Sequence, residues 1–449
     1  MLRTEIAPYF SSEEINQLAA DCGFIQRRRG KIDGATFLNL IIFHKDRLKD
    51  QSLNGLCLSA YKEYGIEIKK QSLHERFNKH AVKFLSNVLE RILQKHLQEE
   101  RFLAKIQGFK RILIKDSTCF QVSENATYLY PGSGGSGSSA AVRIQFEFDL
   151  LSGRITALSL GAYNHQDATD AAETVELINE GELVIRDLAY NHPGVLRKII
   201  EQLAFFISRL HPNYKVYEKR NGTLEEVDFD KLRIHMEKCG LNQMEKDVVL
   251  DKKDPVSLRL IVYLLPENEV TKRIARIRAQ QKKKKRNEPT KEYLSRCRLN
   301  LFITNASKEQ LPITTIYSLY KFRWMVELVF KTWKSIWGIH SIKKVSIHRL
   351  NCYIYAKLLV VITNWDIIWN LLKDANYLGR IIVSIDKCTK FLSMMTEELK
   401  GFFTGDKSKT ARCITLLCKK VNELKCERRL KNKTLLESVA CWVEEAPLC

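Results

Sequence analysis

The sequence predicts an α/β protein with helical regions at both ends. Residues 111–210 alternate between short apolar runs and helical stretches, in the order strand, strand, strand, helix, strand, helix. Residues 1–100 have the periodicity of helices, and the chain after residue 343 is mostly helical with a strongly apolar stretch at 350–372. With 449 residues, 45% of them hydrophobic, the chain can form a proper core and about two to four domains.

The N-terminal region contains a candidate helix-turn-helix. Hydroxyl residues followed by acids at 11–14 indicate a helix start. A helix over 52–64, a turn at Gly65 and a second helix from Ser72 follow, and a long helix is expected over 82–99. The second helix would expose side chains suited to base edges and phosphates: Gln71, His74, Arg76, Asn78 and Lys79. An ordinary helical hairpin with a solvated face fits the same pattern about equally well.

Two aspartates occupy equivalent places in the α/β region. Asp116 ends the apolar run ILIKD and Asp187 ends LVIRD, so each is expected at the end of a short strand. The elements around them are expected to be a Gly/Ser-rich loop at 131–140, hairpin strands at 142–149 and 153–160, a helix at 170–179, and a helix followed by apolar chain at 193–210. A lone aspartate at a strand end is often a cap or turn residue, but two of them favour a site.

A basic segment follows the α/β region. Asn221 and Gly222 indicate a hairpin turn, residues 258–265 a strand, and residues 299–304 another. Between the last two strands the chain is expected to be helical, with 12 Lys and Arg against 3 Asp and Glu over 268–300. An unbroken cationic run lies within it: Lys282, Lys283, Lys284, Lys285 and Arg286. The run is either a solvated arm or a contact to the DNA backbone.

The overall charge favours the second interpretation. Lys and Arg total 73 against 52 Asp and Glu, a net charge of +21, which predicts a polyanionic partner such as double-stranded DNA. No apolar run approaches the roughly 18 residues of a membrane span, and no signal peptide is evident, so neither a membrane nor secretion is expected. The 12 cysteines include no C-x-x-C pair, and they are expected to be reduced thiols and not zinc ligands.

A helix expected over 317–334 carries one acid among bases. Its polar residues recur at steps of three and four, which places them on one face: Tyr320, Arg323, Glu327, Lys331 and Lys334. A second, apolar stripe would dock the helix on a core: Phe322, Val326, Val329 and Trp333. By its charge pattern alone this is an ordinary salt-bridge ladder on a surface helix.

The two aspartates give Glu327 another meaning. Carboxylate oxygens are the hard ligands that Mg²⁺ or Mn²⁺ prefer, and Asp116, Asp187 and Glu327 are suited to two such ions. Two ions about 4 Å apart can activate a water or a 3′-hydroxyl and stabilise the leaving oxygen in a displacement on phosphate. The cations beside Glu327 would then hold phosphates, which explains an acid in a row of bases.

The same residues resemble a known family. The spacing Tyr320-x-x-Arg323-x-x-x-Glu327-x-x-x-x-x-x-Lys334 is similar to the Tyr/Arg/Glu/Lys signature of the IS4-type DDE transposases of bacterial insertion sequences, and Lys331 falls where several members carry an additional Lys. IKDST and IRDLAY resemble the family's first and second Asp blocks. The resemblance covers about residues 105–345.

One departure lies directly after the second Asp block. Leu188 and Ala189 stand where some members have Arg-Glu or a Gly, whereas Tyr190 is retained. A phosphate contact by an arginine at that position is therefore not expected here, and the metal site is unaffected.

The resemblance implies a fold and a domain order. The fold is a ribonuclease-H-like catalytic core interrupted by a mainly β insertion. The implied domains are a helical DNA-binding domain at 1–104, a catalytic domain at 105–348 with the insertion at about 211–298, and a helical domain at 349–449 that is a candidate for dimerisation.

It also implies roles for the site residues. Asp116, Asp187 and Glu327 would be the catalytic ligands of two Mg²⁺ or Mn²⁺ ions. Three residues of the signature would contact DNA phosphates near the cleaved end, with Lys331 in support: Tyr320, Arg323 and Lys334. Arg76, Lys79 and the run at 282–286 would contact DNA elsewhere.

The implied activity is DNA transposition. Such an enzyme binds the terminal inverted repeats of its element, cleaves the DNA ends and joins the 3′-hydroxyl ends to target DNA. It is expected to be a homodimer in the DNA complex. Its expected location is the cytoplasm, in association with the nucleoid. A catalytically inactive, transposase-derived DNA-binding protein is one alternative, and the three retained carboxylates argue against it. A scaffold protein with merely solvated basic faces is another, and the concentration of charge at 268–300 argues against that.

Overall fold

The computed structural model divides into two compact units. The first unit comprises Met1–Ala104, Asp116–His165 and Trp324–Cys449, and the second comprises Lys105–Lys115 and Gln166–Arg323. Within them the structure describes residues 6–26, 31–42, 52–98, 108–134, 138–252, 255–285, 287–379 and 383–426. Arg286 of the predicted cationic run, and the chain after residue 426, lie outside the described residues.

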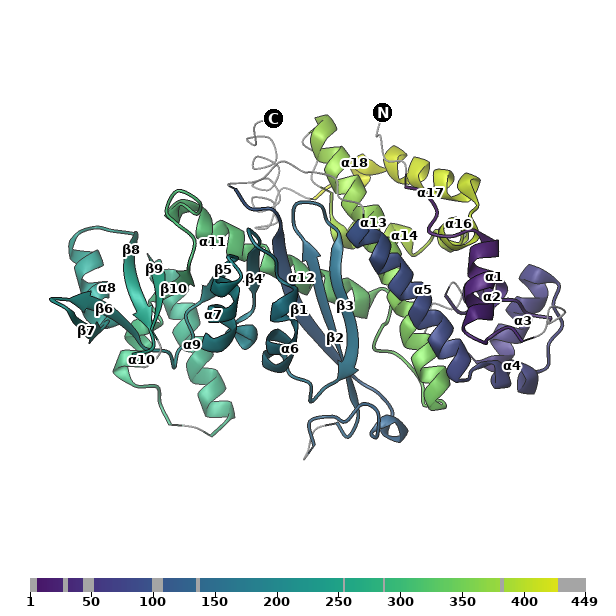
Figure 1. Ribbon diagram of the computed structural model, residues 1–449, viewed down its shortest axis with the longest axis horizontal. Helices are drawn as coiled ribbons and strands as arrows, with labels where there is room; N and C mark the ends of the chain where they lie inside the picture. The colour runs from purple at the N-terminus through teal and green to yellow at the C-terminus, as the bar shows by residue number, and fades with distance from the viewer. Residues whose placement is uncertain are drawn as a thin grey trace. The chain divides into compact units, whose positions relative to one another are not determined.

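A ten-stranded sheet and many helices confirm the predicted α/β class (Figure 1). Hydrogen bonds order the strands as β3-β2-β1-β4-β5-β10-β9-β8-β6-β7. Their bounds are β1 Ile112–Gln121, β2 Ala141–Asp149, β3 Ile155–Ala162, β4 Leu183–Arg186, β5 Phe205–Arg209, β6 Val216–Arg220, β7 Thr223–Glu226, β8 Gln243–Leu250, β9 Val256–Leu264 and β10 Leu299–Thr304.

Three neighbouring strands of the sheet are parallel. β1 pairs with β4 from Ile112 opposite Leu183 to Lys115 opposite Arg186, and β4 pairs in parallel with β5. Parallel neighbours need a crossover, and helix α7 (Pro193–Glu201) supplies it between β4 and β5. Helix α6 (Asp167–Thr174) precedes β4. The apolar faces of these helices join the core cluster that also holds residues of β4 and β5.

Two strands of the second unit were not predicted. β5 is the apolar chain expected after the helix at 193–201, and it pairs antiparallel with β10 through Phe302 opposite Arg209. β8 pairs antiparallel with β9 over its whole length. A five-residue apolar strand directly after a helix has too few residues for periodicity to separate the two elements.

The predicted insertion at 211–298 contains helices as well as strands. Asn221 and Gly222 have φ of 47° and 83°, the left-handed conformation that a two-residue type I′ turn requires, so the predicted hairpin between β6 and β7 is confirmed. Strands β6 to β9 belong to this segment. Its helices are α8 Phe229–Lys238, α9 Glu267–Lys283 and α10 Lys291–Arg296.

A buried arginine ties this segment to the chain that follows β10. The guanidinium of Arg259, on β9, donates to the carbonyls of Ala306 (2.8 Å) and Leu311 (3.2 Å) and to Glu245 Oε2 on β8 at 2.5 Å. Three elements thereby share one cation, whose charge is neutralised by Glu245. The contact fixes where helix α11 (Ile313–Lys321) begins.

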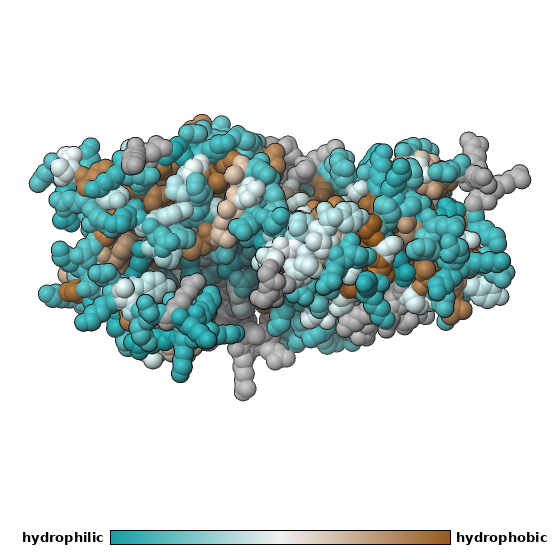
Figure 2. Space-filling view, turned by 90° about the horizontal axis from the view of Figure 1, so that it is seen from below, coloured by the Kyte–Doolittle hydropathy of each residue, from teal (hydrophilic) through white to brown (hydrophobic). Residues whose placement is uncertain are grey.

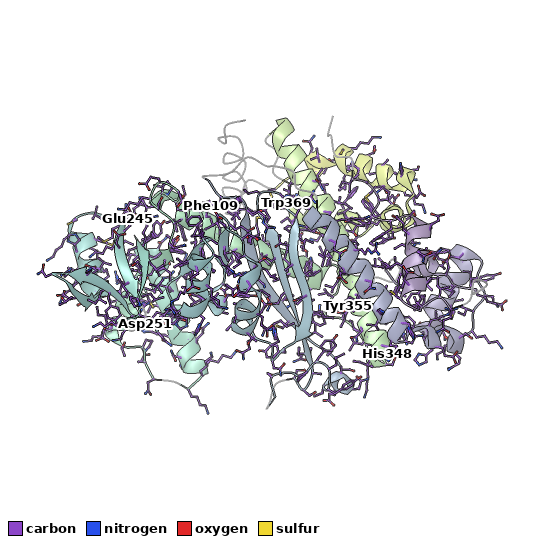
Figure 3. All side chains as sticks on the ribbon, in the orientation of Figure 1. Phe109, Glu245, Asp251, His348, Tyr355 and Trp369 are labelled. Carbon is purple, nitrogen blue, oxygen red and sulfur yellow. The ribbon has the colours of Figure 1, made fainter. Side chains whose placement is uncertain are left out.

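In the first unit, aromatic side chains join the sheet to two helices. β2 is wholly buried, and it pairs antiparallel with β3. Phe146 lies edge-on to Trp333 of helix α12 (Arg323–Ser335), with ring centroids 5.2 Å apart. Phe148 packs on Trp365 and Trp369 of helix α13 (Ile347–Gly379), with ring centroids 4.7 and 5.8 Å apart. Figure 3 labels Trp369 on this helix. Large edge-to-face rings bury much apolar area, so this packing anchors α12.

Several of the remaining helices contact α13. Helix α5 (Lys79–Gln98) runs beside α13 (Figure 1). The others are α1 Ser12–Asp21, α2 Gly34–Ile42, α3 Leu53–Tyr64, α4 Lys70–Arg76, α14 Ile385–Leu392, α15 Thr396–Leu399, α16 Gly401–Thr404, α17 Lys407–Lys419 and α18 Val421–Leu424. Among them, α2, α14 and α17 also contact α13. The predicted helix start at 11–14 is confirmed, because Ser11 and Glu14 form a reciprocal capping box.

One helix within the described residues, Ile347–Leu372, is long and apolar enough to cross a membrane by length and composition. Lys357 and Asp366 interrupt this stretch, so it is not an uninterrupted apolar run of the length that a membrane span needs. Its most apolar window is 89% buried inside the protein, as in the core helix of a globular fold. Figure 2 shows a molecular face that is mostly hydrophilic, with hydrophobic residues scattered over it.

Candidate active site

Asp187 lies where the sequence predicts it, directly after a strand. β4 ends at Arg186, and Asp187 is the N-cap of a short 3-10 helix, Leu188–Tyr190, without accepting a capping hydrogen bond from it. Its side chain is 44% exposed, and Arg323 Nε lies 3.7 Å from Oδ1. The carboxylate is therefore accessible, and a cation accompanies it.

Asp116 differs from its prediction, because it does not end its strand. β1 continues to Gln121, so Asp116 lies inside the strand. Its Oδ1 accepts a hydrogen bond from the backbone N–H of Ser117 at 2.8 Å, and Arg143 Nη1 on β2 donates to Ser117 Oγ at 2.9 Å. The strand continues because Ser117–Gln121 can pair further along the sheet, a tertiary effect that the polar sequence conceals.

Each of the two aspartates directly follows a buried cation. Lys115 and Arg186 are the last pair in the register between β1 and β4, and both are buried. Lys115 forms an ion pair with the buried Asp170 of α6, and its Nζ donates to Thr174 Oγ1 at 3.1 Å. A buried lysine needs such partners because desolvation of its charge is costly. The contacts of Lys115 with Asp170 and Thr174 attach α6 to the place where the β1–β4 pairing ends.

The helix predicted over 317–334 is two helices. α11 ends at Lys321 and α12 begins at Arg323, and the N–H of Phe322 bonds back to the carbonyl of Leu319 at 3.0 Å in a tighter turn. The five signature residues therefore do not lie on one continuous helix. Tyr320 belongs to α11, and the others belong to α12. The predicted apolar stripe is confirmed, because Phe322, Val326, Val329 and Trp333 are all buried.

Tyr320 is buried in the second unit between two guanidiniums. Its side chain is 6% exposed and packs edge-on to Phe302 of β10 at 5.1 Å. Arg209 and Arg323 lie 5.8 and 5.9 Å from the ring centroid. Burial raises the pKa of Tyr320, and the Arg323 guanidinium opposes this shift. Within the described part of the chain, Tyr320 Oη is buried without a hydrogen-bond partner, so its O–H is a donor that lacks an acceptor.

Three other signature residues lie on α12 in the first unit: Glu327, Lys331 and Lys334. Glu327 and Lys331 are exposed, as expected for side chains that meet a ligand from solvent. Lys334 Nζ donates to the carbonyl of Cys119 on β1 at 3.0 Å. This bond holds α12 against the strand that carries Asp116.

The three predicted metal ligands are distributed over both units. Asp116 and Glu327 belong to the first and Asp187 to the second. Among the residues that the structure describes, no group of three or more His, Cys, Asp or Glu side chains could hold a metal ion by itself. The donor chemistry nevertheless fits a hard divalent cation, since all three side chains supply carboxylate oxygens.

The predicted DNA-binding residues of the N-terminal region lie on α4 and α5. α3 ends on Gly65, with φ of 65°, and contacts α4, which begins at Lys70 and not at Ser72. Arg76 is half-buried with its guanidinium 5.7 Å from the Phe24 ring, so packing holds part of this side chain. Lys79 is exposed at the start of α5.

The cationic run lies at the end of α9. Lys282 and Lys283 form its last turn, Lys284 and Lys285 follow, and all four side chains are exposed. The sequence analysis did not identify Arg209 as a site residue. Arg209 is the last residue of β5 (FFISR), and Asp187 directly follows the neighbouring strand β4 (LVIR). Had the apolar segment been recognised as a strand, its terminal arginine would have been a candidate site residue.

Comparison with known proteins identifies the family. A family model described as the transposase DDE domain matches residues 107–363, more than half of the chain. The transposase for insertion sequence element IS231F of Bacillus thuringiensis subsp. israelensis is 31% identical over 373 residues, covering 80% of this chain and 77% of that protein. The chain belongs to the DDE transposases.

The predicted resemblance to the IS4 type is also confirmed. The transposase for insertion sequence element IS1151 of Clostridium perfringens is 27% identical over 385 residues, covering 82% of this chain and 80% of that protein. A piggyBac transposase in a synaptic complex with hairpin DNA has a TM-score of 0.44 at 9% identity, covering 94% of this chain and 84% of that one. The matched domain of this DDE transposase includes Asp116, Asp187 and Glu327, and DNA transposition is its activity class.

Proposed function

We propose that this chain binds the terminal inverted repeats of its insertion sequence, cleaves the DNA ends by metal-dependent phosphodiester hydrolysis and joins the 3′-hydroxyl ends to target DNA. The observation that carries the proposal is the register of β1 and β4. Lys115 pairs with Arg186, and each of these two residues is followed in the sequence by a candidate catalytic aspartate. Carboxylates are the hard ligands that shared divalent ions prefer in a site for phosphodiester cleavage.

The catalytic core is proposed to be ribonuclease-H-like. The strand order β3-β2-β1-β4-β5, with a β2–β3 hairpin and parallel β1, β4 and β5, supports this. The catalytic domain would span 105–348, with the insertion at about 211–298 between β5 and β10. A helical DNA-binding domain at 1–104 and a helical, dimerising domain at 349–449 would flank it.

Asp116, Asp187 and Glu327 would hold two Mg²⁺ or Mn²⁺ ions. When bound, these ions lower the pKa of the attacking hydroxyl or water and stabilise the leaving oxygen. The protein's own contribution is orientation. The Lys115–Asp170 pair and the Lys334–Cys119 bond fix the two elements beside Asp116. Arg323 keeps a cation within 4 Å of Asp187.

The signature cations would hold the DNA phosphate at the cleaved end. Tyr320 would donate its unpartnered O–H to a phosphate oxygen, and Arg323 would present its guanidinium beside it. Lys334 would act as a third contact, with the exposed Lys331 in support. These groups bind and orient the substrate, which is how a phosphoryl-transfer site lowers its barrier.

The remaining DNA would be held by basic side chains outside the signature. Arg76 and Lys79 would contact it in the N-terminal domain, and Lys282, Lys283, Lys284, Lys285 and Arg286 in the insertion. The +21 charge supports long-range attraction to DNA. A homodimer would hold two DNA ends in one complex. The protein would act in the cytoplasm, associated with the nucleoid.

Cleavage of DNA that carries the element's own ends tests the proposal. The wild type is expected to cleave with Mg²⁺ and not with EDTA, whereas Asp187→Asn and Glu327→Gln should lose at least about a thousandfold in rate while still binding the DNA. The exposed Glu180 supplies the matched control Glu180→Gln, which should cleave normally. Equal cleavage by wild type and Glu327→Gln would refute the assignment. Tight binding of the ends by wild type without cleavage would favour the inactive, DNA-binding alternative.

A further inference from the structure

A cavity in the second unit is lined by three arginines. It measures about 230 Å³ and is formed by β5, α9, α10 and β10 together with Leu188, the residue after Asp187. The three arginines are Arg209, Arg273 and Arg296, and none of the described residues that line the cavity is acidic. The volume is below the roughly 300–1,000 Å³ of sites for drug-sized ligands, so a small group fits.

Two of the guanidiniums that line this cavity donate hydrogen bonds to uncharged acceptors. Arg273 donates to the carbonyls of Cys297 (3.0 Å) and Leu299 (3.1 Å) and to Asn300 Oδ1 at 2.6 Å. Arg296 donates to the carbonyls of Pro212 and His211, at 2.7 and 2.9 Å. These bonds fix the orientation of both guanidiniums without neutralising them.

Burial destabilises the charged forms of two of these arginines, and repulsion between arginines adds to the effect in one of them. Burial, followed by the charge of Arg209, lowers the pKa of Arg273, and the Glu269 carboxylate opposes this only weakly. Burial also lowers the pKa of Arg296. Both groups remain cationic at neutral pH because arginine deprotonates only far above it. An anion entering the cavity would relieve this repulsion and gain charge-assisted hydrogen bonds.

We propose that this arginine cavity binds a backbone phosphate of the DNA substrate, one that the signature residues do not contact. Arg209 connects the two places, since it lines the cavity and its guanidinium lies 5.8 Å from the Tyr320 ring. A DNA strand held by Tyr320 and Arg323 would therefore lie beside Arg209, which belongs to the cavity as well. The proposal rests on the proposed function in that it takes DNA as the ligand.

The test places a carboxylate inside the cavity and leaves all three arginines in place. Ile277 of α9 lines the cavity and is half-buried. Ile277→Glu would supply a competing anion, whereas Ile277→Gln is a control of the same size without charge. Ala279 is exposed on the same helix and does not line the cavity, so Ala279→Glu controls for one added negative charge.

Two measurements on the full chain without divalent metal carry the test. In the first, the affinity for a duplex of about 30 base pairs is followed by fluorescence anisotropy against salt. Ile277→Glu should bind about tenfold more weakly than Ala279→Glu, and its log–log salt slope should be smaller by about one, the loss of one phosphate contact. In the second, inorganic phosphate should raise the unfolding temperature more than chloride of equal ionic strength does, except in Ile277→Glu.

The outcomes separate the ligand sources. Equal DNA affinities and slopes for Ile277→Glu and Ala279→Glu overturn the proposal, and phosphate protection that persists in Ile277→Glu does so as well. Phosphate protection specific to the cavity with an unchanged DNA slope would show a site for free phosphate and overturn the DNA assignment. If Ile277→Glu does not fold, Arg296→Gln takes its place in both measurements. Failure of cleavage leaves both readouts unaffected, so it counts against the proposed function alone.

Discussion

The unpartnered hydroxyl of Tyr320 leads to a prediction in which stability and function change in opposite directions. The Tyr320 side chain is buried at 6% exposure, and its Oη has no hydrogen-bond partner among the described residues. Leaving such a group unsatisfied costs about 1–3 kcal/mol. Tyr320→Phe removes the hydroxyl and keeps the ring against Phe302 and between the two guanidiniums. We therefore expect the variant to be more stable than the wild type by about 1 kcal/mol.

The same variant should bind DNA less well. The missing O–H is the proposed donor to a phosphate, and a hydrogen bond to a charged group contributes about 1.5–3 kcal/mol, or a tenfold or greater loss of affinity. A gain of about 1 kcal/mol should raise the unfolding temperature by about 2–4 °C in a unit of 150–250 residues. Scanning fluorimetry without DNA and anisotropy with DNA measure the two effects separately.

A control variant distinguishes loss of the Tyr320 hydroxyl from a general effect of changing a tyrosine on α11. Tyr317 lies one turn earlier on α11 and packs on Tyr263 and Phe302 at 5.6 and 6.0 Å. Tyr317→Phe should leave DNA affinity unchanged. A Tyr320→Phe protein that is less stable than the wild type would refute the reasoning, because the hydroxyl would then be satisfied in the free protein. Unchanged DNA affinity would remove Tyr320 from the proposed phosphate contacts.

Three further changes test other parts of the structure. Lys115→Met leaves Asp170 buried without its cation and should destabilise the protein by about 3–5 kcal/mol, and Asp170→Asn in the same chain should restore part of this. Gly153→Ala should lower the unfolding temperature by several degrees, because φ is 74° and the new Cβ would lie 1.8 Å from the Trp369 ring. Burial raises the pKa of Tyr263 to about 12, so the unfolded state loses its proton first and stability should fall between pH 10 and 12, less steeply in Tyr263→Phe. Thermal unfolding measures the effect of Gly153→Ala, and urea unfolding measures the other two.

The candidate site could be predicted in part because its residue types are unusual for their positions. Asp187 was placed correctly, since an apolar run that stops at an acid marks a strand end. Asp116 was not, because β1 continues through polar residues that only pairing in the sheet keeps extended. The break at Phe322 was missed for a similar reason. Both sides of it have helical periodicity, so no local signal ends the helix there.

The sequence by itself determined the features that depend on neighbouring residues. The hairpin at Asn221 and Gly222, the strand Leu299–Thr304 and the end of α3 at Gly65 follow from local conformational preferences. The order and spacing of the signature residues likewise indicated the transposase family before any fold was known, and the comparisons confirm it.

Only the tertiary structure decided which groups lie together. The register that places Lys115 opposite Arg186 depends on hydrogen bonds between segments some 70 residues apart. The cavity of Arg209, Arg273 and Arg296 draws its charges from three elements, and the unsatisfied hydroxyl of Tyr320 depends on burial against β10. Charge and burial of this kind arise from long-range packing, because local sequence preferences do not specify which distant side chains exclude water from a group.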